Sequence, residues 1–482
     1  MKICDRVIDI FKALAQVPRQ SKHEEKVSAW LVERAQKHGF DVERDDANNV
    51  FIRVPATPGY EHAPTLILQG HMDMVCEKTP GSSHNFDTDP IDVIIEDGWM
   101  HANQTSLGAD DGLGVALALA MAEDPDIEHP ALEIFITSDE ETGMTGASAL
   151  RPEQLKGRIL LNLDSEDEGI FTVGCAGGRE TKATLTLQKT TVTPGTRVVA
   201  IHIGGLLGGH SGCEIDKGRA SAIKLSARLI SNIMADVRDV CLVDFSAGSA
   251  HNAIPRNADL VLAVPAQDEK RVTDILDRMA RVFASEFKAT DPGIAISHVE
   301  SDCTAQNVYK TDSLRTLCDL LLCYPHGVAS MNHEVAGLVE TSDNLASLSI
   351  EIEKDTVHLL SSQRSSVMSK LNALTARIEA CIRLAGGEFQ SSKGYPGWAP
   401  DMESDLLRRC VATYEARFGH KPVVNVIHAG LECGIIGAKI PDMQMISFGP
   451  TVVSPHSPQE RAEIATIQKV ADFLIDLLKS YK

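Results

Sequence analysis

The sequence lacks the features that usually mark membrane-inserted, secreted or disulfide-built proteins. No uninterrupted apolar run reaches the roughly 18–20 residues that a membrane-spanning helix needs. Residues 1–20 lack the extended apolar segment of a secretory signal. The 11 cysteines form no CxxC pair, and an odd, scattered set suits a reducing compartment better than a disulfide framework. We therefore expect a cytoplasmic protein that is not associated with a membrane.

Positive charge is also scarce relative to negative charge. The chain has 46 Lys and Arg residues against 67 Asp and Glu residues, a net charge of −21 at pH 7. This balance argues against the phosphates of nucleic acids or anionic lipids as partners, because like charges repel. The length of 482 residues exceeds what one compact core usually holds, so at least two domains are expected.

The order of predicted helices and strands indicates how these domains are arranged. Residues 1–177 alternate helical and strand patterns, as does the region beyond a Gly-, Ser- and Pro-rich segment at 386–400. We predict a discontinuous α/β catalytic domain, a mixed sheet flanked by helices, formed by 1–177 and 397–482. An α+β lid domain of residues 178–396 is inserted into it. The two halves of the insert share one element pattern, which favours an internal duplication.

Imidazole and carboxylate side chains recur where predicted strands end or helices begin. They occur in five short segments: His71 and Asp73 in "GHMD", Asp110 in "GADDG", Glu140 and Glu141 in "SDEETG", Asp164 in "NLDSE" and His456 in "SPHS". Sites in open α/β sheets form beyond the carboxyl ends of the strands. Nitrogen and oxygen ligands without thiolate suit Zn²⁺, Mn²⁺ or Co²⁺. Each segment alone is explained as a turn or an acidic helix start, but together they predict a two-metal site.

Two smaller patterns lead to separate expectations. Ser21 and Glu24 have the spacing of a capping box ahead of a helix, so we expect them to cap it. His210 lies in the glycine-rich segment "LLGGHSGCEI" of the insert, where a histidine taken alone is more often structural than functional.

The whole chain resembles the M20 metallopeptidase family, and within it the aminoacyl-histidine dipeptidase (peptidase D) branch. The resemblance rests on "GHMDMV", "GADDGLG", "SDEETGMTGA", "NLDSEDEG", "GCAGG", "GGHSG", "HNAIPRNA" and "GPTVVSPHSPQE". It implies two zinc ions, one held by His71 and Asp164, the other by Glu141 and His456, with Asp110 bridging. It also implies that Asp73 orients His71 and that the Asp110–Asp111 peptide bond is cis.

The resemblance further assigns the reacting and substrate-binding groups. Glu140 is implied as the general base for a water activated by the two zinc ions. Spacing alone leaves open that Glu140 is the ligand and Glu141 the base, and the family pattern decides between them. In the insert, His210 is implied to stabilise the oxyanion. Asn252, Arg364 and Gly430 are implied to bind substrate, with Arg364 pairing with a C-terminal carboxylate.

The function that the resemblance implies is hydrolysis of unblocked dipeptides, including Xaa-His dipeptides such as carnosine, by a cytoplasmic metallo-dipeptidase. Zinc is the expected metal, with cobalt and manganese as alternatives. An M20-type tripeptidase or an N-acyl amino-acid deacylase is the alternative enzyme. An inactive metal- or peptide-binding homologue is disfavoured because no ligand or base is missing. In the family this inserted domain either pairs two subunits or is doubled within one chain, and the length of the insert favours the doubled domain. A homodimer through another surface stays open.

Overall fold

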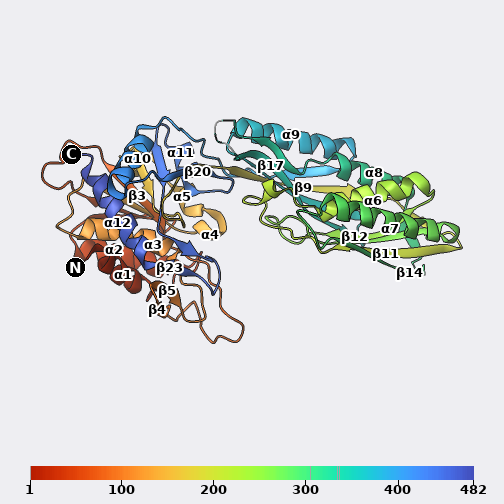
Figure 1. Cartoon of the computed structure of the whole chain (residues 1–482), viewed down its shortest axis with the longest axis horizontal. Coiled ribbons are helices and arrows are strands. Elements are labelled where there is room, and N and C mark those ends of the chain that lie inside the picture. Colours follow the sequence, from red (N-terminus) through yellow and green to blue (C-terminus); the bar gives the residue numbers. More distant parts are fainter. Residues whose placement is uncertain (1, 304, 334, 336) are drawn as a thin grey trace. The chain divides into compact units, whose positions relative to one another are not determined.

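A computed structural model describes residues 2–303, 305–333, 335 and 337–482 of the chain (Figure 1). Its contacts divide the chain into two compact units. Unit 1 comprises Met1–Cys175, Trp398–Val426 and Leu431–Lys482, and unit 2 comprises Ala176–Gly397 and Ile427–Gly430. The sequence division assigns 427–430 to the first domain, whereas these residues group with unit 2. The reason is that the Ala176 N–H donates to the Ile427 and Ala429 carbonyls, at 3.1 and 3.0 Å.

Unit 1 is built on an eight-stranded mixed sheet in the order β1-β2-β6-β3-β7-β21-β8-β20. The strands are β1 (Asp41–Arg44), β2 (Val50–Val54), β3 (Leu66–His71), β6 (Leu132–Thr137), β7 (Ile159–Asn162), β8 (Ile170–Cys175), β20 (Val423–Ile427) and β21 (Gln444–Ser447). β3 runs parallel to β6 and β7, and β7 parallel to β21. β3 and β6 are buried along their whole length, as expected for central strands with apolar sequences. The carboxyl ends of β3, β6, β7 and β21 therefore lie at one edge of the sheet.

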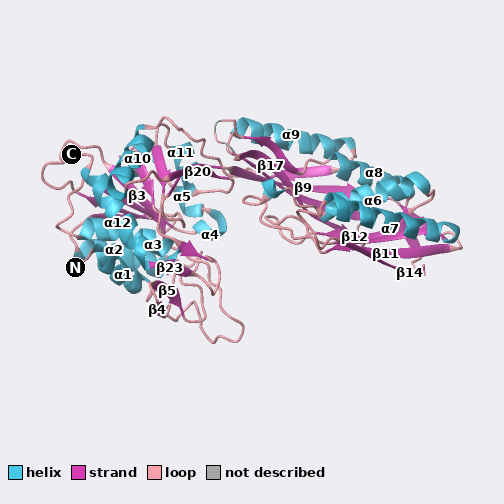
Figure 2. Cartoon of the chain, in the orientation of Figure 1, coloured by secondary structure: helices cyan, strands magenta, loops and turns pink. Residues whose placement is uncertain are grey.

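Helices surround this sheet (Figure 2). They are α1 (Ile3–Leu14), α2 (Glu25–Lys37), α3 (Ala109–Glu123), α4 (Glu140–Gly143), α5 (Thr145–Ala149), α10 (Asp405–Phe418), α11 (Glu432–Lys439) and α12 (Ile464–Lys479). The small side chains of α3 allow it to pack closely against β3 and α1. The Asp110–Asp111 peptide bond in its first turn is cis, as predicted.

A second, four-stranded sheet in unit 1 has the order β22-β23-β5-β4. Its strands are β4 (Val93–Glu96), β5 (Trp99–Ala102), β22 (Val452–Val453) and β23 (Arg461–Glu463). The pairing of β23 with β5 joins the C-terminal region to the N-terminal part of the unit. The loop between β22 and β23, which contains His456, is therefore held at both ends.

Unit 2 is an 11-stranded sheet with four long helices, α6 (Ala222–Asp236), α7 (Glu269–Glu286), α8 (Thr311–Cys323) and α9 (Met368–Leu384). Its main path is β14-β11-β13-β12-β17-β18-β9-β19, with β10, β15 and β16 attached. The strands are β9 (Gly177–Thr186), β10 (Lys189–Thr191), β11 (Thr196–Gly204), β12 (Cys241–Ala247), β13 (Ala258–Pro265), β14 (Ala295–Asp302), β15 (Asn307–Tyr309), β16 (Gly327–Met331), β17 (Val339–Glu351), β18 (Thr356–Ser365) and β19 (Glu388–Ser391). The helices gather on one face (Figure 2), and the apolar core lies between them and the sheet. The two units confirm the predicted fold class.

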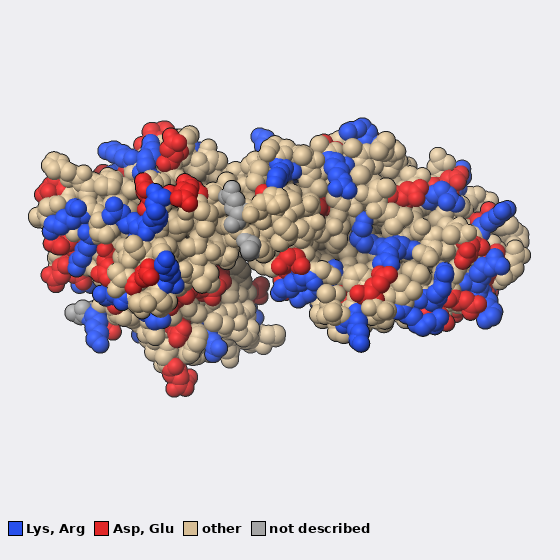
Figure 3. All heavy atoms as spheres, turned by 45° about the horizontal axis from the view of Figure 1, so that its top comes forward, with Lys and Arg blue, Asp and Glu red and all other residues tan. Residues whose placement is uncertain are grey.

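The surface carries charges of both signs. Figure 3 shows Lys and Arg side chains interspersed with Asp and Glu side chains on the visible face of each unit. Among the helices of the described residues, none is both long and apolar enough to cross a bilayer.

Candidate functional site

The strand ends of unit 1 bring the predicted metal-binding side chains together. His71 is the last residue of β3, Glu140 and Glu141 open α4 just beyond β6, and Asp164 follows β7. His456 comes from the loop between β22 and β23. Because β3, β6 and β7 are parallel neighbours, their ends deliver these side chains to one edge of the sheet.

Asp110 lies between the two histidines. One of its carboxylate oxygens is 3.1 Å from Nε2 of His71, and the other is 3.0 Å from Nε2 of His456. Each histidine also faces a second carboxylate: Asp164 Oδ1 is 3.3 Å from His71 Nε2, and Glu141 Oε2 is 3.1 Å from His456 Nε2. The arrangement is two imidazole–carboxylate sets that share Asp110.

The pKa values of these groups reflect the crowding of charge. Burial alone would raise the pKa of Asp110, but hydrogen bonds from His456 and His71 lower it below the usual range. Burial raises the pKa of Asp164 to about 7. Contacts with Asp110 and Glu141 raise the pKa of His456 to about 11. Carboxylates thus outnumber imidazoles in this largely buried cluster, and a bound cation would offset the repulsion between the carboxylates.

The donor set fits divalent cations. His71, Asp110 and Glu141 offer ligand atoms that all lie within 4.8 Å of one another. Oε1 of Glu141 is buried without a hydrogen-bond partner, although an unpaired buried carboxylate oxygen is costly. The side chains of His71, Asp110, Glu141 and Asp164 are 1–10% exposed, whereas His456 is 49% exposed. The site is therefore enclosed by the strand ends and open toward His456.

Asp73 connects the histidine of β3 to the start of α4. Its side chain is fully buried, with Oδ1 3.4 Å from Nδ1 of His71. The same carboxylate accepts hydrogen bonds from the backbone N–H groups of Glu140 and Glu141, at 3.0 and 3.2 Å. The backbone carbonyl of Asp73 also lies 3.2 Å from Nδ1 of His71. The Asp73 carboxylate therefore holds the first turn of α4 and lies beside the His71 ring. Glu140 is half-buried, and desolvation of its carboxyl group raises the pKa well above the ordinary value.

The expected capping box at Ser21 and Glu24 is wrong. The Ser21 hydroxyl donates to Asp73 Oδ2 at 2.8 Å, and Glu24 Oε1 accepts from the backbone N–H of Asp139 at 3.0 Å. Helix α2 begins without a side-chain cap. Both residues instead stabilise the loops of the candidate site, because tertiary partners compete successfully with the local capping interaction.

Two further residues that sequence reasoning did not identify hold the turn before Asp110. Glu460 accepts hydrogen bonds from four consecutive backbone N–H groups, those of residues 107–110, at 2.7–3.4 Å. The buried guanidinium of Arg19 donates to the carbonyls of Met72, Asp73 and Gly108. The one available sequence signal is that Glu460 follows His456 by four residues in "PHSPQE".

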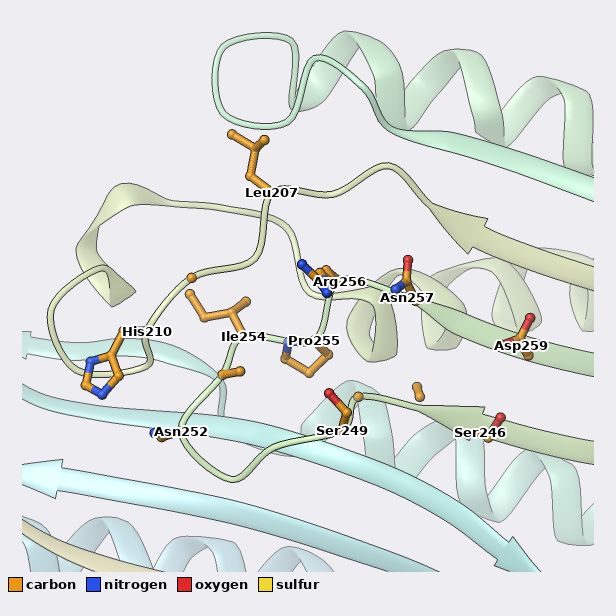
Figure 4. A pocket seen from close by; sticks show the side chains of 14 residues that line it. Leu207, His210, Ser246, Ser249, Asn252, Ile254, Pro255, Arg256, Asn257 and Asp259 are labelled. Carbon is orange, nitrogen blue, oxygen red and sulfur yellow. The ribbon is translucent and has the colours of Figure 1, made fainter. Parts of the chain in front are cut away.

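The predicted substrate-binding residues belong to unit 2. His210 and Asn252 line a cavity of about 600 Å³, and Figure 4 shows them at one end of it with Asp259 at the other. Nδ1 of His210 accepts from the N–H groups of Gly212 and Cys213, at 3.2 and 3.1 Å, so the neutral ring carries its proton on Nε2. Burial and the charge of Arg364 lower its pKa, which favours this neutral form.

The other two predicted residues lie elsewhere in the same unit. Arg364 is 7% exposed and donates to the Tyr395 hydroxyl at 3.2 Å, and its buried Nε has no hydrogen-bond partner among the described residues. Gly430 ends the segment that begins at Ile427. His428 in that segment was not predicted. Its Nε2 lies 2.7 Å from the Ser342 hydroxyl, and burial lowers its pKa to about 4.

Comparisons with known proteins place the whole chain in one peptidase family. The model of peptidase family M20/M25/M40 matches residues 67–480. The chain is 36% identical over 471 residues to the cytosol non-specific dipeptidase of Escherichia coli, covering 98% of this chain and 96% of that protein. The crystal structure of aminoacylhistidine dipeptidase from Vibrio alginolyticus superposes with a TM-score of 0.91 at 38% identity, covering 98% and 96% of the two chains. A Bacillus cereus aminopeptidase at 17% identity, with a TM-score of 0.57 over 99% and 98% of the chains, shares the fold.

Proposed function

Because the chain belongs to peptidase family M20/M25/M40, and is therefore a hydrolase of peptide bonds, we propose that it cleaves unblocked dipeptides with two divalent cations. Xaa-His dipeptides such as carnosine are among the proposed substrates, in keeping with the names of the Escherichia coli dipeptidase and the Vibrio alginolyticus aminoacylhistidine dipeptidase. The observation that carries the proposal is the position of Asp110, whose two carboxylate oxygens face His71 and His456 separately.

The chain supplies a ligand set for each cation. His71 and Asp164 would hold one, Glu141 and His456 the other, and Asp110 would contact both. We propose zinc as the metal, with cobalt or manganese able to replace it, since all three accept imidazole and carboxylate ligands. When bound, such ions lower the pKa of water and polarise the scissile carbonyl.

Glu140 is the proposed general base. It would take the proton of the attacking water and pass it to the leaving amine. Burial raises the pKa of Glu140 above the ordinary value of a glutamate, which makes its carboxylate a stronger base. The close approach of Glu141 to His456 supports the assignment of Glu141 as the ligand and Glu140 as the base.

The second unit would bind the rest of the substrate. Nε2–H of His210 is a suitable donor to a developing oxyanion. The Arg364 guanidinium, buried with its Nε unpaired among the described residues, is suited to a C-terminal carboxylate. Asn252 and the backbone N–H of Gly430 are proposed as further contacts. We propose a cytoplasmic location for the enzyme, and a homodimer as an assembly to be tested by sedimentation.

A substrate panel tests this function. Ala-His, Gly-Gly-Gly and an N-acetyl amino acid are incubated with the enzyme before and after chelation, and again after zinc is returned. The dipeptide is expected to be cleaved fastest, with activity lost on chelation and recovered with zinc. Preferred cleavage of Gly-Gly-Gly would favour the tripeptidase, and preferred cleavage of the N-acetyl amino acid would favour the deacylase. No turnover of any substrate with both cations bound would favour the inactive homologue.

A further inference from the structure

A buried hydrogen-bond network joins the strand ends on which the candidate metal site is built. Its centre is Glu432, the first residue of α11, whose side chain is 0% exposed. Oε2 of Glu432 accepts hydrogen bonds from Gln69 Nε2 and from the Thr137 hydroxyl, each at 2.6 Å. Oε1 of Gln69 in turn accepts from Asn162 Nδ2 at 2.6 Å. One glutamate from outside the sheet thus links three of its strands.

The three linked residues stand where the regular strand pairing ends. Gln69 is on β3, Thr137 on β6 and Asn162 on β7. The last register pair of β3 with β7 is Gln69–Asn162, and the last pair of β3 with β6 is His71–Thr137. Beyond these pairs one backbone hydrogen bond continues on each side of β3, from the Met72 amide to the Thr137 carbonyl and from the Leu163 amide to the Gln69 carbonyl. The main chain then enters the loops of the site.

Each linked residue is close in sequence to a site residue. Gln69 precedes His71 by two residues and therefore shares its face of β3. Asn162 precedes Asp164 by two residues, and Thr137 precedes Glu140 by three. A displacement of any one of these strand ends would therefore move a ligand or the base.

We propose that Glu432 is a positioning residue that fixes the ends of β3, β6 and β7 relative to one another, and so sets the spacing of His71, Glu140 and Asp164. The inference rests on the proposed function, in which His71 and Asp164 bind a cation and Glu140 is the base. Glu432 itself is not assigned to substrate or cation.

Stability alone does not explain a glutamate at this place. Oε1 of Glu432 is buried without a hydrogen-bond partner, which costs free energy that an apolar side chain would not cost. Burial also raises the pKa of Glu432 to about 8, so the neutral, nearly isosteric Gln is a fitting conservative replacement. The oxygen of a Gln side chain can accept both hydrogen bonds that Oε2 now accepts.

The test compares Glu432→Ala with Glu432→Gln in the full chain. Cation affinity is measured by chelator competition, ligand geometry by the visible absorption of the Co²⁺-loaded protein, and turnover by kcat and KM on Ala-His. Hydrogen exchange is followed at the Met72 and Leu163 amides, which donate to the Thr137 and Gln69 carbonyls at 2.8 and 2.9 Å.

For Glu432→Ala we expect about 10–100-fold weaker cation binding, an altered Co²⁺ spectrum, faster exchange at both amides and lower kcat with little change in KM. Glu432→Gln is expected to restore all four readouts. If Glu432→Ala does not fold, Thr137→Val removes one of the two donors at nearly constant volume and is expected to show the same changes to a smaller extent.

Glu133→Ala is the matched control, because Glu133 is a buried glutamate near the opposite end of β6. Its carboxylate accepts from the N–H groups of Lys156 and Gly157 at 2.9–3.1 Å. This variant is expected to lower stability and leave the Co²⁺ spectrum unchanged.

Three results would overturn the proposal: wild-type behaviour of Glu432→Ala, equal damage in Glu432→Gln, or an equal spectral change in Glu133→Ala. Failure of the wild-type enzyme to hydrolyse any dipeptide would instead refute the proposed function. The exchange at Met72 and Leu163 would still decide the role of Glu432, because that readout needs neither cation nor substrate.

Discussion

Replacement of Glu460 by Gln tests whether one carboxylate holds the turn that presents Asp110. Oε2 of Glu460 accepts from the N–H groups of Leu107 and Gly108 at 2.7 and 2.9 Å, and Oε1 accepts from those of Ala109 and Asp110 at 2.7 and 3.4 Å. A Gln side chain keeps one oxygen and turns its NH₂ group toward the other two N–H donors. Two backbone donors are then left unpaired in a place where Glu460 is 2% exposed.

The size of the effect follows from the bonds that are lost. A hydrogen bond to a charged group contributes about 1.5–3 kcal/mol, and the 3.4 Å bond contributes less, so Glu460→Gln is expected to lower the free energy of unfolding by about 2–4 kcal/mol. Urea denaturation measures this loss, and cation content after dialysis reports the effect on the site. Both are expected to fall.

Glu133→Ala is again the control, because it also leaves two backbone N–H groups unpaired, at Lys156 and Gly157. It is expected to lower stability and leave the cation content unchanged. An unfolding free energy for Glu460→Gln within about 0.5 kcal/mol of wild type, the range of ordinary surface substitutions, would refute the reasoning.

Arg364→Ala is expected to raise KM for Ala-His more than for its C-terminal amide, because the amide has no carboxylate to lose; equal effects in steady-state kinetics would contradict this. Burial raises the pKa of Asp343 to about 8 in the folded chain. As the pH rises from about 4 toward 8, the unfolded chain releases the Asp343 proton while the folded chain keeps it, so the free energy of unfolding falls over this range. Asp343→Asn is therefore expected to gain stability relative to wild type between pH 5 and pH 8 in urea denaturation. Gly114→Ala would place Cβ 2.2 Å from Asp111 Oδ1 and 2.7 Å from the Leu163 carbonyl, so a lower melting temperature is expected.

The strands and the ligand types of the site could be predicted from the sequence because both depend on local pattern. The apolar run Leu66–Leu68 forms β3, and the polar residues that follow it lie at the sheet edge where parallel strands end. The spacing of Glu140 and Glu141 could not separate base from ligand. Their different environments arise from folding, since Glu141 faces His456 from a loop far along the chain.

Glu460 and Glu432, which support the site, could not be predicted, because their partners are backbone groups or distant side chains. Glu460 bonds to the N–H of Leu107, 353 residues away, and Glu432 bonds to Gln69, 363 residues away. Ser21 shows the opposite error: its spacing from Glu24 matched a local rule, but Asp73 is the partner in the fold. Tertiary hydrogen bonds leave no periodic pattern in the sequence.

The central claim, that two cations and Glu140 act together on a peptide bond, is tested most directly by Glu140→Ala. Cations bound per chain and turnover of Ala-His are measured on the variant and on wild type, with circular dichroism to verify folding. The prediction is two cations per chain in both proteins and turnover lowered by about 10²–10⁴-fold in the variant, as expected for loss of a general base. Turnover retained by Glu140→Ala, or wild-type hydrolysis that survives complete removal of the cations, would contradict the account.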